Sequence, residues 1–185
     1  SPTVSSEMQR TAVLATMVAG LLTLIYITFR FRDVRFGLAS IIALLHDVFI
    51  VIAMYVIFQI PVNNNFIAAI LTIVGYSINN TIVVFDRIRE NGRYYRPDQI
   101  TSLVNDSISQ TMGRSLNTSI TTIIMVLMLF ILGVESIRWF AFPLLAGFVA
   151  GTYSSLVIAS PVWVLLQKVG KKKAIRQSRR AVRKK

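Results

Sequence analysis

Long blocks without a charged residue are the feature that most constrains the fold of this chain. Lys, Arg, Asp and Glu are absent from residues 11–29, 36–45, 48–85, 115–134 and 139–167. A helix needs about 20 apolar residues to cross roughly 30 Å of hydrocarbon. The blocks lack the alternation of apolar and polar residues that marks a membrane β-barrel strand. They therefore predict an all-α fold, a polytopic membrane helix bundle.

Five spans fit into these blocks, all within a single transmembrane domain that covers residues 1–185. The 185 residues are 54% hydrophobic and 15% charged, which is more apolar than a soluble domain with one core. The longest block is cut by the turn sequence IPVNNN, Ile60 to Asn65. The expected spans are residues 12–29, 37–60, 65–85, 116–132 and 140–166, followed by a basic tail at residues 167–185.

The distribution of Lys and Arg predicts the orientation of the spans. The N-terminal segment has one basic residue, the turn after the first span three and the Asn-rich turn none. The middle loop has five, the next turn one and the C-terminal tail ten. Cytoplasmic loops carry the excess of Lys and Arg, so the N-terminus of this chain is expected outside and the C-terminus in the cytoplasm.

A first span that enters from outside has no signal of its own to export the residues before it. We therefore expect an upstream exported segment, with at least one further span and an external domain that this chain does not contain. The alternative is that a short, nearly neutral tail, residues 1–11, crosses without help.

The net charge of +12 comes mostly from the tail, because ten basic residues lie between Lys168 and Lys185. Such a tail is typical of a positive-inside anchor that is attracted to anionic membrane lipids. Contact with ribosomal RNA or another acidic partner is the alternative interpretation.

Enzyme chemistry finds little support in the sequence. The chain has no cysteine and a single histidine, His46, so a two-histidine metal site cannot be built within it. No nucleophile elbow and no phosphate-binding loop is present, and no cofactor or metal is expected.

The middle loop contains one amphipathic pattern. Apolar residues recur at helical spacing behind Pro97 and Asp98, at Ile100, Leu103, Val104, Ile108 and Met112. The pattern predicts a cytoplasmic amphipathic helix that lies against the membrane surface or a partner.

Polar groups inside the spans are the candidate functional residues. His46 and Asp47 interrupt the second span, and the distance from Arg35 places the carboxylate roughly 18 Å deep at about 1.5 Å per residue. An intramembrane carboxylate usually belongs to an ion path or a buried pair. Both interpretations remain open: an ion path, or mutual satisfaction of His46, Asp47 and a polar group on another span.

Two further polar stripes lie on the third and fourth spans. Asn79 and Asn80 precede the charged run that begins at Asp86. On the fourth span, a stripe recurs at intervals of three and four residues, at Arg114, Asn117, Thr118 and Thr121. Two stripes at similar depth can face each other across the bundle, either as a hydrated cation path or as interhelical hydrogen bonds.

Small residues repeat every fourth position on the last span, at Gly147, Gly151 and Ser155 and at Ala146, Ala150 and Ser154. Such a ridge lets another helix approach closely, and packing inside this bundle is the favoured interpretation. Pro143 and Pro161 should distort the ends of this span.

Three motifs in order give the chain a family resemblance. LLHDV (44–48), GYSINNTIVVFDRIREN (75–91) and GRSLNTSITT (113–122) resemble segments of the SecF family of protein-export membrane subunits. The polar residues of the expected cytoplasmic motif within them are Asp86, Arg87, Arg89, Glu90 and Asn91. The resemblance covers nearly the whole chain.

The resemblance implies a resistance-nodulation-division fold with six spans per half, in a bacterial plasma membrane. The chain would be part of a separate SecF or of the SecF half of a fused SecD and SecF. It implies an accessory subunit that uses the ion-motive force with SecD to draw an unfolded protein through the SecYEG channel. A YidC-type insertase and the ribosome are further candidate partners. The alternatives are a small-molecule or lipid exporter of the same superfamily and a passive translocon scaffold.

The resemblance also assigns residues. Arg114 matches the family's buried arginine, and Asn117, Thr118, Ser119, Thr121 and Thr122 match the polar stripe after it. Asn80 stands where the family usually has an aspartate. Since an amide does not exchange a proton near neutral pH, a titrating carboxylate would have to lie in SecD or at Asp47.

Overall fold

Five long helices form the part of the chain that the computed structural model describes, residues 2–170. They are α1 (Pro2–Phe31), α2 (Val34–Ile57), α3 (Asn64–Asn91), α4 (Ile100–Leu132) and α5 (Glu135–Ser154). Helix α5 continues through a π-helical turn, η1 (Ser155–Ala159), and the last helical turns end at Gly170. Each of the five is long and apolar enough to cross a membrane. These helices confirm the predicted all-α membrane bundle, while residues 171–185 of the basic tail lie outside the described part.

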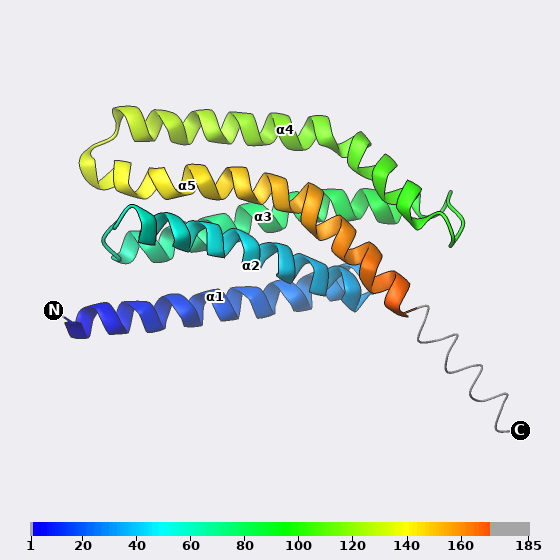
Figure 1. Cartoon of the computed structure of the whole chain (residues 1–185), viewed down its shortest axis with the longest axis horizontal. Coiled ribbons are helices and arrows are strands. Elements are labelled where there is room, and N and C mark those ends of the chain that lie inside the picture. Colours follow the sequence, from blue (N-terminus) through cyan, green and yellow to red (C-terminus); the bar gives the residue numbers. More distant parts are fainter. Residues whose placement is uncertain (1, 171–185) are drawn as a thin grey trace, which may run out of the picture.

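The helices run antiparallel in sequence order, so that the connections alternate between two ends of the bundle (Figure 1). One end carries Arg30, Arg32 and Arg35 at the α1–α2 turn and the α3–α4 loop with Arg93 and Arg96; we call it the basic end. The Asn-rich turn and the α4–α5 turn lie at the opposite end. Helix α1 is the least buried of the five and α5 the most buried.

The expected amphipathic helix is the first part of α4 and not a separate element. Leu103 and Val104 are buried against Phe85 and Ile88 of α3, so their apolar face packs inside the bundle. The prediction that this face lies on a membrane surface or a partner is therefore wrong for Leu103 and Val104, while Met112 of the same pattern is 41% exposed. Figure 1 shows these first turns of α4 inclined to the rest of the helix.

Two tight turns end helices without glycine. Arg32 and Gln59 adopt left-handed backbone angles, with φ of 55° and 51°, which stop α1 and close the turn after α2. The following helices start with side-chain caps: Asp33 accepts from the backbone N–H of Arg35 at 2.9 Å, and Asn63 from that of Asn65 at 2.9 Å. The Asn-rich sequence thus begins α3, as the turn prediction required.

Two apolar clusters fill the bundle. At the basic end, Phe36 stacks on Trp163 with ring centroids 4.7 Å apart and meets Phe85 edge to face at 4.8 Å. In the opposite half, the cluster includes Val51, Ile73 and Phe148. Buried polar residues such as Ser77 and Asn80 of α3 and Thr152 of α5 lie between the residues that these helices contribute to the two clusters.

Proline shapes the end of α5. Pro161 has no N–H to donate to the carbonyl four residues earlier, and its ring crowds that carbonyl. The π-helical turn Ser155–Ala159 precedes it and absorbs this irregularity. The expected distortion therefore occurs at Pro161, whereas α5 runs through Pro143 as an α-helix.

The small residues of α5 allow close approach to α2 and α3. A Cβ atom on Gly147 would lie 2.5 Å from Ile73 Cδ1 and 2.9 Å from Val51 Cγ2. A Cβ atom on Gly151 would lie 3.4 Å from Ser77 Cβ. The ridge packs inside the bundle, in agreement with the favoured interpretation.

We expect Gly147→Ala to lower the free energy of unfolding by about 1–3 kcal/mol, because the added methyl overpacks Ile73 and Val51. The matched control is Gly75→Ala on α3, where a Cβ atom meets nothing within 4 Å. The thermal unfolding midpoints of the purified variants measure the difference. Equal midpoints for the two variants would contradict the proposed close packing of α5.

Candidate functional site

A layer of buried polar side chains separates the two apolar clusters, and we call it the polar layer. It comprises Asp47 of α2, Ser77 and Asn80 of α3, Ser115 and Ser119 of α4, and Thr152, Ser154 and Ser155 from the last helix. Four of the five helices therefore contribute to it. Such groups are costly inside a membrane bundle unless they bind one another, water or an ion.

Asp47 is the only charged residue of the polar layer, and its side chain is fully buried. Ser77 Oγ donates to its Oδ2 atom at 2.5 Å, and Ser154 Oγ donates to the same oxygen at 2.7 Å. His46 Nδ1 lies 2.9 Å from the other oxygen, Oδ1. His46 is one-third exposed, so it connects the buried carboxylate with the outside of the bundle.

A second group of hydroxyls joins α3, α4 and α5. Tyr76 donates its hydroxyl to Ser119 Oγ at 2.7 Å, and Ser119 Oγ lies 2.6 Å from Thr152 Oγ1. Thr152 and Ser119 also donate to carbonyls of their own helices, at Phe148 and Ser115. These hydroxyls fix the register of α3 against α4.

That register brings two unsatisfied polar atoms to one level. Asn80 is one turn beyond Tyr76 on α3, and Ser115 is one turn before Ser119 on the antiparallel α4. Asn80 Nδ2 and Ser115 Oγ are both buried, and neither has a hydrogen-bond partner within the described residues. Buried polar atoms of this kind usually bind water or an ion.

The polar stripe of α4 points away from the bundle. Arg114, Asn117, Thr118 and Thr121 are all exposed, and the threonine hydroxyls donate to carbonyls of α4 itself. The prediction that this stripe faces Asn80 across the bundle is wrong, because the stripe is exposed whereas Asn80 is buried. The residues of α4 that face inward are instead Ser115, which follows Arg114, and Ser119, which follows Thr118.

The two adjacent asparagines separate in the same way. Asn79 is exposed, whereas Asn80 is 3% exposed. Within residues 2–170, no ion-pair partner contacts Arg114. The candidate residues therefore form two groups: an inward group around Asp47 and Asn80, and an outward group around Arg114.

The charged motif at the end of α3 fastens the basic end. Asp86 pairs with Arg30 of α1 at 3.0 Å, and Arg89 Nη1 donates to the Arg30 carbonyl at 3.1 Å. Arg87 pairs with Glu90 at 2.8 Å. Because Arg30 belongs to α1, this part of the motif ties α3 to α1.

The same motif also binds α4. Arg87 Nε donates to Gln110 at 2.6 Å, and Asn91 donates to Ser107 at 2.9 Å. Nearby, Tyr95 donates to Asp106, and this hydrogen bond raises the pKa of the Tyr95 hydroxyl. The motif residues of α3 therefore connect α3 to both α1 and α4.

The sequence pattern does not identify the residues that bind Asp47. It marks Ser154 only as a small residue of the ridge, and it does not single out Ser77. Ser77 lies three residues before Asn80, which is the spacing of one helical face, and this was the available signal. Within residues 2–170, no cluster of three or more His, Asp or Glu could hold a metal ion.

Known proteins match this chain over most of its length. The family model described as "Protein export membrane protein SecD/SecF, C-terminal" matches residues 1–169. The protein translocase subunit SecF of Alicyclobacillus acidocaldarius is 46% identical over 183 residues, which are 97% of this chain and 59% of that relative. The chain thus spans about three fifths of the length of this relative.

Relatives in which SecD and SecF are named together, and solved structures of such proteins, are also similar to this chain. The protein translocase subunit SecDF of Bacillus subtilis is 44% identical over 167 residues, covering 89% of this chain and 22% of the relative. The crystal structure of SecDF from Thermus thermophilus, a translocon-associated membrane protein, superposes with a TM-score of 0.83 at 45% identity. It covers 91% of this chain and 23% of that one. The chain therefore belongs to the SecD/SecF C-terminal family of protein export membrane proteins.

Proposed function

We propose that this chain is the membrane portion of a SecF subunit, an accessory of the Sec protein translocase. In this proposal, SecF works with SecD and uses the ion-motive force to promote the export of an unfolded protein through SecYEG. The names of the relatives, protein translocase subunit SecF and SecDF, support this assignment over a small-molecule or lipid exporter. The names of these relatives also favour a role in which this chain catalyses no reaction itself.

The observation that carries the coupling role is the fully buried carboxylate of Asp47. When ionised, a carboxylate only accepts hydrogen bonds, and Ser77, Ser154 and His46 supply three donors. When protonated, Asp47 can itself donate to His46 Nδ1, so the pair offers two places for one proton. In this proposal, the partly exposed ring of His46 is the point through which a proton reaches Asp47.

Asn80 and Ser115 support a hydrated continuation of this route. Their unsatisfied atoms lie toward the basic end from the Tyr76–Ser119 contact, and Asn80 is one turn from Ser77. Water bound between them would satisfy both atoms and extend a hydrogen-bonded path toward the basic end. Asn80 positions water or an ion in this path but carries no proton itself.

Arg114 is proposed to act across the boundary with SecD. Its guanidinium remains charged at any physiological pH and is costly at the surface of a membrane span without a counter-charge. Asp47 is enclosed by His46, Ser77 and Ser154, which leaves a carboxylate of SecD as the partner. The exposed stripe at Asn117, Thr118 and Thr121 extends the same contact surface.

We further propose the inner bacterial membrane as the location, with the basic end in the cytoplasm. In this orientation, the N-terminus of this chain lies outside. Contacts of the basic end with a YidC-type insertase or the ribosome fit its positive charge. A passive scaffold remains the second candidate, because hydrogen bonds around Asp47 also hold α2, α3 and α5 together.

Asp47→Asn is expected to abolish the stimulation of export by an ion gradient. The amide keeps the size of the side chain but cannot exchange a proton or hold a charge. Export of a reporter into inverted membrane vesicles, with and without an imposed gradient, measures the effect. Asp98→Asn, in the exposed α3–α4 loop, is the matched control. It should change neither the export rate with the gradient nor the export rate without it. Full stimulation in Asp47→Asn at normal complex levels would rule out the coupling role.

A second variant separates coupling from packing at the same site. Ser77→Ala together with Ser154→Ala removes two donors but leaves the carboxylate. If Asp47 couples the gradient, this double variant should shift the pH dependence of stimulation. If the hydroxyls only hold helices together, it should lower the amount of folded complex without a shift in pH dependence.

Arg114→Ala should remove gradient-dependent stimulation without loss of complex, because one charge contributes little to a large interface but is required for the pairing with SecD. Asn80→Asp should be tolerated and should shift the pH dependence, since it adds a titratable group to the polar layer. The same vesicle assay measures both variants. Stimulation that survives Arg114→Ala at wild-type complex levels would favour the scaffold.

A further inference from the structure

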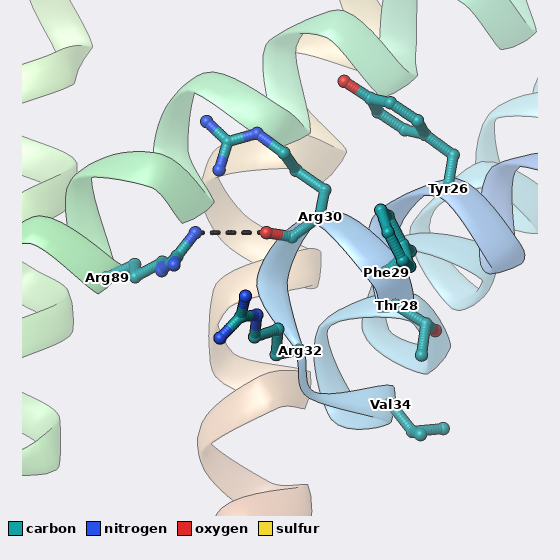
Figure 2. A pocket seen from close by; sticks show the side chains of 7 residues that line it. All are labelled: Tyr26, Thr28, Phe29, Arg30, Arg32, Val34 and Arg89. Atoms are coloured by element: carbon teal, nitrogen blue, oxygen red, sulfur yellow. Dashed lines mark hydrogen bonds between the residues drawn. The ribbon is translucent and has the colours of Figure 1, made fainter.

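A groove of about 880 Å³ opens beside the end of α1 at the basic end. It is lined by Tyr26, Thr28, Phe29, Arg30, Arg32, Val34 and Arg89. Figure 2 shows the guanidinium groups of the three arginines gathered on one side, with Tyr26, Phe29 and Val34 on the other. The groove thus combines a cationic wall with an apolar and aromatic wall.

The cationic wall keeps an excess of positive charge. Asp86 neutralises Arg30 through the ion pair at 3.0 Å, and Arg89 uses one N–H for the Arg30 carbonyl. No carboxylate pairs with Arg32 or Arg89 in residues 2–170. Two guanidinium groups therefore keep free donors in the fork geometry that suits phosphate oxygens.

The apolar wall lies at the level where a membrane meets water. Arg30 is the first charge after the uncharged block of α1, so this is the end of the first span. Phe29 is 85% exposed and Tyr26 53% exposed on this helix. Exposed aromatic side chains at the end of a span are typical of the interfacial belt, where they contact the glycerol and upper acyl region of lipids.

We propose that this groove binds the phosphate of an anionic phospholipid, held by Arg32 and Arg89 with Arg30 behind them. The acyl chains then extend along α1 past Phe29 and Tyr26. Charge complementarity selects an anionic headgroup, because a zwitterionic lipid would bring its own cation against the arginines. The exposed aromatic wall favours a lipid over free phosphate, since soluble phosphate gains nothing from it. Basic pockets beside spans bind anionic headgroups in other membrane proteins.

The test compares phosphatidylglycerol with phosphatidylcholine of identical acyl chains, added to the full-length protein in detergent and counted by native mass spectrometry. The wild type should retain phosphatidylglycerol preferentially. Arg32→Gln should weaken this binding about fivefold, and Arg32→Gln with Arg89→Gln about twentyfold, from the loss of one and two charges at the headgroup. The guanidinium of Arg32 has no ion-pair partner within residues 2–170, so the single variant tests binding even if the double variant folds poorly.

The control is Arg93→Gln with Arg96→Gln, which removes two exposed arginines from the same end of the bundle but not from the groove. It should weaken phosphatidylglycerol binding less than about twofold. An equal loss in this control would show a general effect of charge and overturn the proposal. So would unchanged binding in Arg32→Gln.

A third arm separates the possible sources of phosphate. Inorganic phosphate at the concentration of the lipid phosphate should neither displace phosphatidylglycerol nor raise the unfolding midpoint of the wild type. Displacement by inorganic phosphate would mark a site for a soluble anion and overturn the assignment to a lipid. In membranes that contain the whole complex, a photoreactive residue in place of Val34 should form adducts with lipid. Adducts with protein alone would show that a partner covers the groove and would overturn the proposal.

Discussion

The buried carboxylate of Asp47 is the constraint on which the packing of this bundle depends. A charge in an apolar interior costs several kcal/mol unless donors surround it. The donors come from Ser77 of α3 and Ser154 of α5, so three helices must approach within hydrogen-bonding distance at one level. Gly147 and Gly151, on the turns of α5 before Ser154, make that approach possible on the α2 and α3 side. The hydrogen bonds to Asp47 therefore depend on the close helix packing that Gly147 and Gly151 allow.

The basic end is organised by a different kind of interaction. The side chains of the Arg30–Asp86 pair are about 40% exposed and Glu90 of the Arg87–Glu90 pair is 64% exposed, so each pair contributes little to stability. These pairs instead fix the positions of the helices relative to one another, because the motif on α3 contacts α1 through Arg30 and α4 through Gln110 and Ser107. These contacts connect α1, α3 and α4, and they leave Arg32 and Arg89 with free donors at the groove.

The spans were predictable from the sequence because an apolar stretch of about 20 residues without a charge is rare outside membrane helices. The rotation of each helix was not. The spacing of Arg114, Asn117, Thr118 and Thr121 showed that they share a face, but the neighbours decide whether that face is buried. Here α3 and α5 contact Ser119, on the face that also carries Ser115, and the stripe turns outward. Ser77 and Ser154 could not be identified because small hydroxyl residues suit helix packing and ion binding equally well.

The inward group around Asp47 and Asn80 and the outward group around Arg114 place opposite charges on different sides of the helices. Asp47 lies inside the bundle, and Arg114 lies on its surface one residue before the inward-facing Ser115. Ser115 and Asn80 share a level, and Asn80 is one turn from Ser77, which binds Asp47. The unsatisfied atoms of Asn80 and Ser115 thus lie on the inner faces of α3 and α4, between the turn of α3 that binds Asp47 and the turn of α4 that carries Arg114 on its outer face. In the proposed function, a change of charge at Asp47 would reach Arg114 through rearrangement of these polar groups and the water they bind, because polar groups screen a direct field between two charges. In the proposed complex, the contact of Arg114 with SecD is where that change would become movement.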